Sequence, residues 1–187
     1  MSTFFISDMH FGHANVLAYD NRPFSNIAEH DNALIERWNS VVTNNDDVWI
    51  LGDISWYGPQ TTAQIYSQLN GTKRLCIGNH DKKLLKDSRI QDLFVEIVPY
   101  KEIAVGSIGV VLCHYPIPCF NHHYHGWVHL YGHVHNSFEA NMCEHFKYEM
   151  ETLYEKPCRM YNVGCMMPEI SYTPRTLEQI LRAHEGI

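Results

Sequence analysis

Five short, β-like runs of apolar residues in this chain each end directly in side chains that bind metal ions. Short apolar runs bounded by glycine or polar residues are typical of buried strands. The residues that follow the five runs are, in chain order, Asp8 with His10, Asp53, Asn79 with His80 and Asp81, His114, and His133 with His135. In open α/β sheets the functional crevice lies outside the carboxyl ends of the strands. We therefore expect these side chains to converge on one site.

Two of these groups place a pair of donors one residue apart, Asp8 with His10 and His133 with His135. In extended backbone, residues i and i+2 point to the same side, so each pair can offer two donors to one centre. Glycines that permit sharp turns or close backbone approach stand directly before three of the groups: Gly52, Gly78 and Gly132. Each motif alone would also suit a surface loop or a turn. Five of them in this order favour a shared metal site.

Apolar runs alternate with amphipathic stretches in the first half of the chain, which favours an α/β fold. There we expect strands at residues 3–6, 47–51 and 72–77, helices at residues 29–42 and 59–69, and a short basic helix near residues 81–86. In the second half we expect strands at residues 93–105, 107–113, 127–131 and 159–163. A last helix at residues 177–184 should begin with a capping box of Thr176 and Gln179. Residues 136–157 are polar and poorly periodic, and they fit either a long loop or a small excursion from the fold.

Composition and charge limit the kind of protein this is. With 45% hydrophobic and 19% charged residues, and with no repeat or linker, the sequence predicts one domain over residues 1–187. The net charge of −7 and the lack of a basic block argue against partners such as nucleic acid or an anionic membrane. No apolar run approaches the roughly 20 residues that a membrane span needs. The absence of a signal peptide, with six cysteines and no CxxC pair, predicts a reduced, cytoplasmic protein.

The order of the motifs resembles that of the calcineurin-like metallophosphoesterases. The matching segments are SDMH (7–10), GD (52–53), GNHD (78–81), CHYP (113–116) and YGHVH (131–135). The resemblance extends from about residue 3 to the NVG at residues 162–164, and the size and the FGH after SDMH are similar to small bacterial or phage members. It implies an α/β fold in the form of a four-layer α/β/β/α sandwich with mixed sheets and two metals at its centre.

Carried over position by position, the resemblance implies a complete ligand set. One metal would bind to Asp8, His10 and His135, the other to Asn79, His114 and His133, and Asp53 would bridge the two. Carboxylate, imidazole and amide donors suit two divalent transition-metal ions, of which we expect manganese first, with iron, nickel, cobalt or zinc as alternatives. The charge of two such ions exceeds that of the two carboxylates and a bridging hydroxide, so the site should attract a phosphate ester.

The family resemblance also implies a reaction, the in-line attack of a metal-bridging hydroxide on a phosphate ester. His80 would act as general acid or charge stabiliser, and Asp81 would orient His80 or cap the following helix. Residues 52–58 contain no arginine that could grip a phosphate, which favours a phosphodiesterase over a phosphomonoesterase and argues against a protein phosphatase. A non-catalytic interaction scaffold on the same fold is the alternative from another class, while the negative charge argues against a nuclease.

Three further residues are candidate contacts for a small phosphate-ester substrate such as a nucleotide. His13 follows Gly12 close to the predicted centre, and Arg22 offers a guanidinium for a phosphate or for a structural contact. His122 belongs to a loop at residues 120–127 that we expect to overhang the site, because it lies between two ligand-bearing strands. A role in a polar surface loop is the alternative for His122.

Overall fold

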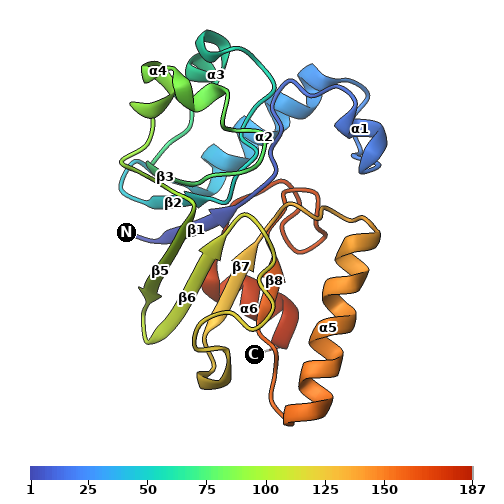
Figure 1. Ribbon diagram of the computed structural model, residues 1–187. Coiled ribbons are helices and arrows are strands. Elements are labelled where there is room, and N and C mark those ends of the chain that lie inside the picture. Colours follow the sequence, from blue (N-terminus) through green and yellow to red (C-terminus); the bar gives the residue numbers. More distant parts are fainter. Residues whose placement is uncertain (187) are drawn as a thin grey trace.

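The computed structural model describes residues 1–186 and has two β-sheets at its centre with helices on their outer sides (Figure 1). Ile187, the last residue of the expected domain, lies outside the described residues. Inner residues of both sheets, such as Phe5 and Leu130, belong to one buried cluster, so the sheets pack on each other. The arrangement is the four-layer sandwich predicted from the sequence.

The first sheet has the strand order β4-β3-β2-β1-β9. Its strands are β1 (Thr3–Ile6), β2 (Asp47–Ile50), β3 (Thr72–Cys76), β4 (Glu96–Val98) and β9 (Arg175–Thr176). The first four are parallel, and β9 runs antiparallel to β1. Parallel strands place their carboxyl ends at one edge of the sheet, so the loops after β1, β2 and β3 lie side by side.

The second sheet has the order β5-β6-β7-β8. It consists of β5 (Tyr100–Val105), β6 (Ile108–Cys113), β7 (Val128–Tyr131) and β8 (Met160–Asn162). β5 and β6 form an antiparallel hairpin, whereas β6, β7 and β8 are parallel. The segments that begin with His114 and Gly132 therefore leave the sheet at the same edge.

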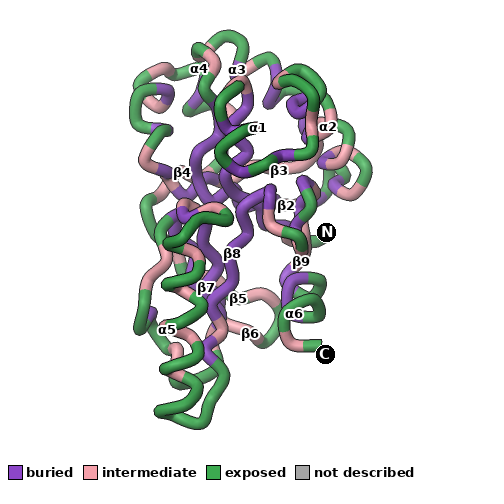
Figure 2. The backbone as a smooth tube through the Cα atoms, turned by 90° about the vertical axis from the view of Figure 1, so that its right-hand side faces the viewer, coloured by how far each residue is buried: buried purple, intermediate pink, exposed green. Residues whose placement is uncertain are grey.

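Helices cover both outer faces. Leu34 and Trp38 of α2 (Ile27–Val41) and Tyr66 of α3 (Pro59–Tyr66) pack on the first sheet. α5 (Phe138–Tyr154) covers the second sheet with Cys143 and Phe146, although much of its surface is exposed (Figure 2). The remaining helices are α1 (Val16–Tyr19), α4 (Ser88–Gln91), α6 (Leu177–Glu185) and the 3-10 turns η1 (Leu84–Lys86) and η2 (His123–His125).

Most predicted elements are confirmed with small changes at their ends. Strand 3–6 is β1, and the helices expected at residues 29–42 and 59–69 are α2 and α3. The capping box of Thr176 and Gln179 is present at the start of α6. Within residues 1–186, no helix has the length and apolar character required to cross a membrane.

Three expectations need correction. The strand predicted at residues 93–105 is two strands in different sheets, β4 and β5, separated by Pro99, which cannot donate a ladder hydrogen bond. The basic helix near residues 81–86 is reduced to turns and η1. Residues 136–157 are neither of the expected alternatives, because most of them form α5. Four short elements, α1, α4, η2 and β9, were not predicted, since such pieces show no periodicity.

Candidate metal centre

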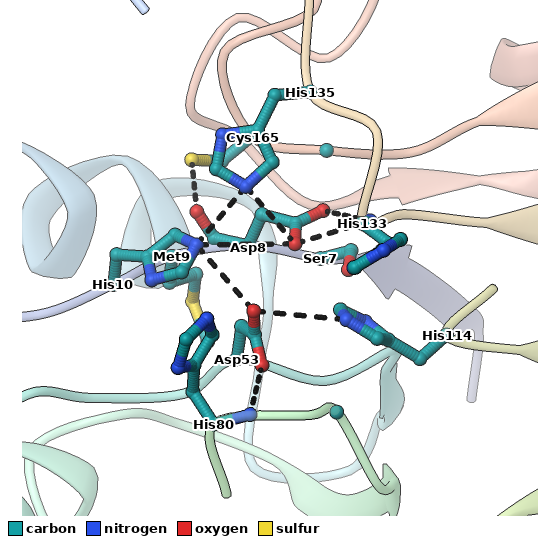
Figure 3. A network of polar contacts seen from close by, with 12 residues as sticks. Ser7, Asp8, Met9, His10, Asp53, His80, His114, His133, His135 and Cys165 are labelled. Atoms are coloured by element: carbon teal, nitrogen blue, oxygen red, sulfur yellow. Dashed lines mark hydrogen bonds and ion pairs between the residues drawn. The ribbon is translucent and has the colours of Figure 1, made fainter. Parts of the chain in front are cut away.

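The seven side chains predicted as metal ligands lie together at the edge where the parallel strands of the two sheets end. Figure 3 labels six of them, all but Asn79. A first group consists of Asp8, His10 and His135. Nε2 of His10 lies 3.1 Å from Nε2 of His135, and Oδ1 of Asp8 lies 3.5 Å from the same His135 atom. Three donor atoms so close together can coordinate a single cation.

A second group surrounds the side-chain oxygen of Asn79. Oδ1 of Asn79 lies 2.8 Å from Nε2 of His114 and 3.0 Å from Nδ1 of His133. Asp53 lies between the two groups, since its Oδ2 is 3.6 Å from Nε2 of His114 and 3.7 Å from Nε2 of His10. The Asp53 carboxylate can therefore reach a cation in either group.

The donor pairs converge through left-handed backbone, and not through the extended backbone that we expected. The φ angles are 54° at Asp8, 51° at His10, 71° at His133 and 48° at His135. Asp53 shares this conformation, with φ of 55°. Non-glycine residues adopt it rarely and at a cost in free energy, and such residues gather at functional sites. Both pairs therefore share positive φ angles at both of their donor residues.

Glycines make room for the two carboxylates. A Cβ atom on Gly132 would lie 2.3 Å from Oδ2 of Asp8 and 2.1 Å from Oγ of Ser7. A Cβ atom on Gly78 would lie 2.3 Å from Oδ1 of Asp53. The close approach that the sequence predicted at these glycines is confirmed.

Hydrogen bonds behind the site fix the orientation of two imidazoles. Nδ1 of His114 donates to the carbonyl of Leu51 at 2.6 Å, and Nδ1 of His135 donates to the carboxylate of Asp20 at 2.9 Å. Each Nε2 is thereby left with a free lone pair toward the centre. Asp20 was missed in the sequence, because no apolar run precedes it and its partner is 115 residues away.

The electrostatics of the site follow from burial and crowding. Burial opposes ionisation of Asp8, but His135, His114 and His10 outweigh it and hold the pKa of Asp8 well below its usual range. Burial raises the pKa of Asp53, and the charge of Asp8 adds to that effect against the attraction of His114. Burial also keeps the pKa of His10 far below the usual value for histidine, which favours the neutral imidazole.

The residues present fit a pair of divalent transition metals. Two carboxylates, an amide oxygen and four imidazoles point lone pairs into a small buried space, a donor set that such ions prefer. The buried Nδ1 of His10 has no hydrogen-bond partner within residues 1–186, so the ring is held by packing and by what its Nε2 binds. The Asp and His clusters are therefore compatible with a dinuclear metal site.

His80 lies beside this centre. Its backbone N–H donates to Oδ1 of Asp53 at 3.0 Å, and its exposed imidazole is 6.1 Å from the ring of His10. Partial burial lowers the pKa of His80 despite the opposing charge of Asp81. The imidazole can therefore reach a group bound at the metal centre from its open side.

The expectation for Asp81 needs correction. Its buried carboxylate accepts hydrogen bonds from the backbone N–H groups of Gly78, Asp53 and Ile54, at 2.8 to 3.0 Å. Among the hydrogen bonds of residues 1–186, none joins this carboxylate to the imidazole of His80 or caps the helix that follows. Asp81 instead holds the loop that carries Asp53 against the loop that carries His80.

The three residues predicted as substrate contacts differ in whether they lie beside the metal centre and are free to bind a ligand. His13 lies beside the centre, 5.6 Å from the ring of His10, and stacks on Trp56 at 4.0 Å. Arg22 is buried, and its guanidinium donates to Asp20 and to the carbonyls of Asp8 and Met9, so it cannot grip a phosphate. The structural alternative for Arg22 is therefore correct.

His122 lies away from the metal centre, contrary to the expectation. Because β6 and β7 are parallel, the chain must return to the opposite edge of the sheet before β7 begins. The loop that carries His122 leads into the lower end of β7 in Figure 1, and the His122 ring packs on Trp127, which covers Gly109 near the start of β6. The loop does not overhang the site.

Two aromatic residues next to the ligands were also missed. Trp56 is 43% exposed, with its ring 4.3 Å from that of His80, and Tyr115 is 42% exposed, with its ring 4.7 Å from that of His133. Their only sequence signal is that each closely follows a ligand, Asp53 or His114. Both rings are therefore partly exposed beside the candidate metal centre.

Comparisons with known proteins agree with this picture. The family model for calcineurin-like phosphoesterases matches residues 1–157. The uncharacterized protein MJ1445 of Methanocaldococcus jannaschii is 31% identical over 97% of this chain and 90% of its own length. The Gene 66 protein of Mycobacterium phage L5 is 44% identical over 43% of this chain and 40% of its own. The crystal structure of AQ665, a protein of unknown function from Aquifex aeolicus, has the same fold, with a TM-score of 0.73, 23% identity and coverage of 97% of this chain and 98% of that one.

Proposed function

Because the chain belongs to the calcineurin-like phosphoesterases, which are metal-dependent hydrolases of phosphate esters, we propose that its substrate is a small phosphodiester. One ion would be held by Asp8, His10 and His135 and the other by Asn79, His114 and His133, with manganese as the first choice. When bound, two such ions lower the pKa of a water molecule and neutralise charge on phosphoryl oxygens.

The position of Asp53 is the observation that carries the two-metal mechanism. Its Oδ2 lies within 3.7 Å of one imidazole from each donor group, and its Oδ1 accepts the backbone N–H of His80. A single carboxylate thus links the two ligand groups to the loop of the proposed catalytic histidine. This supports two ions that share Asp53 better than it supports one structural ion, which would need only one of the groups.

His80 is the residue that we propose for proton transfer or charge stabilisation. Its imidazole lies on the open side of the centre, where the oxygen of a leaving group would point. An N–H of that ring can donate to the departing alkoxide, which is otherwise a poor leaving group. Asp81 would act only indirectly, as the residue that holds the His80 loop in place.

A diester fits the charges around the centre better than a monoester. Arg22 is committed to Asp20 and to backbone carbonyls, so its guanidinium is not free to neutralise the second charge of a phosphomonoester. A phosphodiester carries a single negative charge. A non-catalytic scaffold is disfavoured because all seven donor positions are filled by competent residues that face one another.

The test is the hydrolysis of bis-p-nitrophenyl phosphate and of p-nitrophenyl phosphate by protein stripped with EDTA and reloaded with Mn²⁺. We expect the diester to be hydrolysed with the higher kcat/KM. An Asp8→Asn variant, purified in the same way, controls for contaminating enzymes. A preference for the monoester would identify a phosphomonoesterase. Failure to hydrolyse either ester with manganese, iron, nickel, cobalt or zinc would favour the non-catalytic scaffold.

A further inference from the structure

A cleft with a volume of about 600 Å³ opens directly beside the metal centre. Its walls are the loop at residues 55–59, which follows Asp53, and the segment 79–84, which begins with the ligand Asn79 and the neighbouring His80. A group attached to a phosphate at the centre would enter this cleft after passing His80. The cleft is therefore placed to bind the leaving-group side of a substrate.

One wall of the cleft is aromatic. The Trp56 ring stacks on His13 with an angle of 6° between the planes and a centroid distance of 4.0 Å, which fixes its orientation. With 43% of its surface exposed, Trp56 still offers part of its apolar ring to the cleft, next to the His80 ring at 4.3 Å. Tyr57 adds a second ring, which packs where a Cβ atom on Gly12 would lie. Preoriented aromatic rings of this kind bind planar groups, such as nucleobases, by stacking.

The rim of the same cleft carries positive charge. Lys82 and Lys83 are exposed lining residues, and neither belongs to an ion pair among residues 1–186. The preceding Asp81 does not neutralise them at close range, because its carboxylate is buried against backbone amides. In a chain of net charge −7, two adjacent unpaired lysines beside the centre provide a local site for an anion.

We propose that this cleft binds a nucleotide with a second phosphate as the leaving group, so that the substrate class is a 5′-phosphorylated dinucleotide. The inference rests on the proposed phosphodiesterase function. The base would stack on Trp56, and the terminal phosphate would contact Lys82 and Lys83. Hydrolysis adds the oxygen of water to phosphorus and breaks the bond to the 3′-oxygen, which leaves as an alcohol after it receives a proton. The products are two nucleoside 5′-monophosphates.

The experiment compares pApA with ApA, which lacks the terminal phosphate, using the Mn²⁺-loaded enzyme. We expect kcat/KM to be about tenfold higher for pApA, mainly through KM, because two exposed charge contacts are gained. Raising the salt from about 50 to about 500 mM should reduce this ratio, because exposed charges are screened. The double variant Lys82→Ala/Lys83→Ala should bring the ratio close to one. Lys86→Ala, which removes an exposed lysine outside the cleft, should keep it.

Trp56→Leu tests the stacking contact separately. It should raise KM about tenfold for both dinucleotides, since both lose the contact of a base with the indole. Equal kcat/KM for pApA and ApA, or a ratio that survives the double lysine variant, would overturn the inference while hydrolysis of bis-p-nitrophenyl phosphate keeps the proposed function intact. If no diester is hydrolysed at all, the proposed function fails and the inference fails with it.

Discussion

Asp20 joins the metal centre to a buried arginine. Its carboxylate accepts a hydrogen bond from Nδ1 of His135 at 2.9 Å and two from the guanidinium of Arg22 at 2.8 and 2.9 Å. Arg22 in turn contacts His30, and His30 contacts Asp31, which accepts the backbone N–H of Gly12. A carboxylate behind a metal-binding imidazole fixes its tautomer and raises its basicity.

Asp20→Asn should therefore weaken metal binding, even though Asp20 is no ligand in the proposed set. Loss of the charge removes both the support for His135 and the partner of Arg22, and we expect the affinity for Mn²⁺ to fall by about 10- to 100-fold. Titration of the EDTA-treated protein with Mn²⁺ measures this affinity, and circular dichroism verifies the fold. Asp87→Asn, at a partly exposed carboxylate paired with Arg89 and away from the metal centre, is the control. Equal affinities for the two variants would contradict the role of Asp20.

The contrast between Asp20 and the seven proposed ligands shows what the sequence could predict. Each ligand follows an apolar strand within a few residues, so strand pattern and residue type together identify it. Asp20 follows α1, a helix of four residues that has no visible period, and only the fold brings it to His135. The two alternatives for Arg22, a phosphate contact or a structural contact, could not be separated for the same reason, since its partners are known only once the chain is folded.

The helix α5 was not predicted, for a different physical reason. Its 17 residues include none that is fully buried, so no apolar stripe with helical period separates its inner face from its outer face. Exposed Phe138, Met142 and Leu153 further obscure the pattern. The positive φ angles at the ligands could not be predicted either, because Asp and His adopt this conformation more often than most residues but still only rarely, so residue type alone does not identify it.

Asp53→Asn should lower the metal content from two ions per chain to one or none. The substitution keeps the size of the side chain but removes the charge that both cations would share. Elemental analysis of the purified variant, reloaded under the same conditions as the wild type, measures the outcome. Retention of two ions with unchanged affinity would show that Asp53 does not bridge them.

His80→Ala should reduce kcat for bis-p-nitrophenyl phosphate by about 10²- to 10⁴-fold, as expected when a positioned proton donor is removed. The metal content should not change, because the contact of His80 with Asp53 is made by its backbone N–H, which alanine retains. Parallel measurement of kcat and of bound metal separates the two effects. Wild-type turnover in the fully loaded variant would remove His80 from the mechanism.

Gly132→Ala should disrupt the metal centre through sterics alone. The new methyl group would lie 2.3 Å from Oδ2 of Asp8 and 2.1 Å from Oγ of Ser7, so the Asp8 side chain must move. We expect loss of metal and of activity. Gly106→Ala is a useful comparison, because its left-handed φ of 60° makes it costly, by about 1 kcal/mol, while its Cβ meets open space far from the ligands. Metal loss in both variants would point to general destabilisation instead.

His129 should make the metal-free protein sensitive to acid. The ring is buried in β7, donates from Nδ1 to the carbonyl of Val111 and accepts the backbone N–H of Ile117, so it is held neutral. Burial lowers the pKa of His129 to about 4, despite the opposing effect of the Val111 and Tyr115 carbonyls beside the ring, whereas the pKa in the unfolded chain is about 6.5. Between these values the unfolded state binds a proton that the folded state does not.

The free energy of unfolding should therefore fall as the pH falls from about 6.5 to about 4, by up to about 1.4 kcal/mol per pH unit from this group. His129→Gln cannot take up that proton, so its unfolding free energy should depend less steeply on pH over this range, although lost hydrogen bonds make it less stable near neutral pH. Urea unfolding in EDTA at a series of pH values measures both slopes, and the difference between them isolates His129 from the other histidines. Identical slopes would mean that the pKa of His129 is the same in the folded and unfolded protein, which would contradict the prediction.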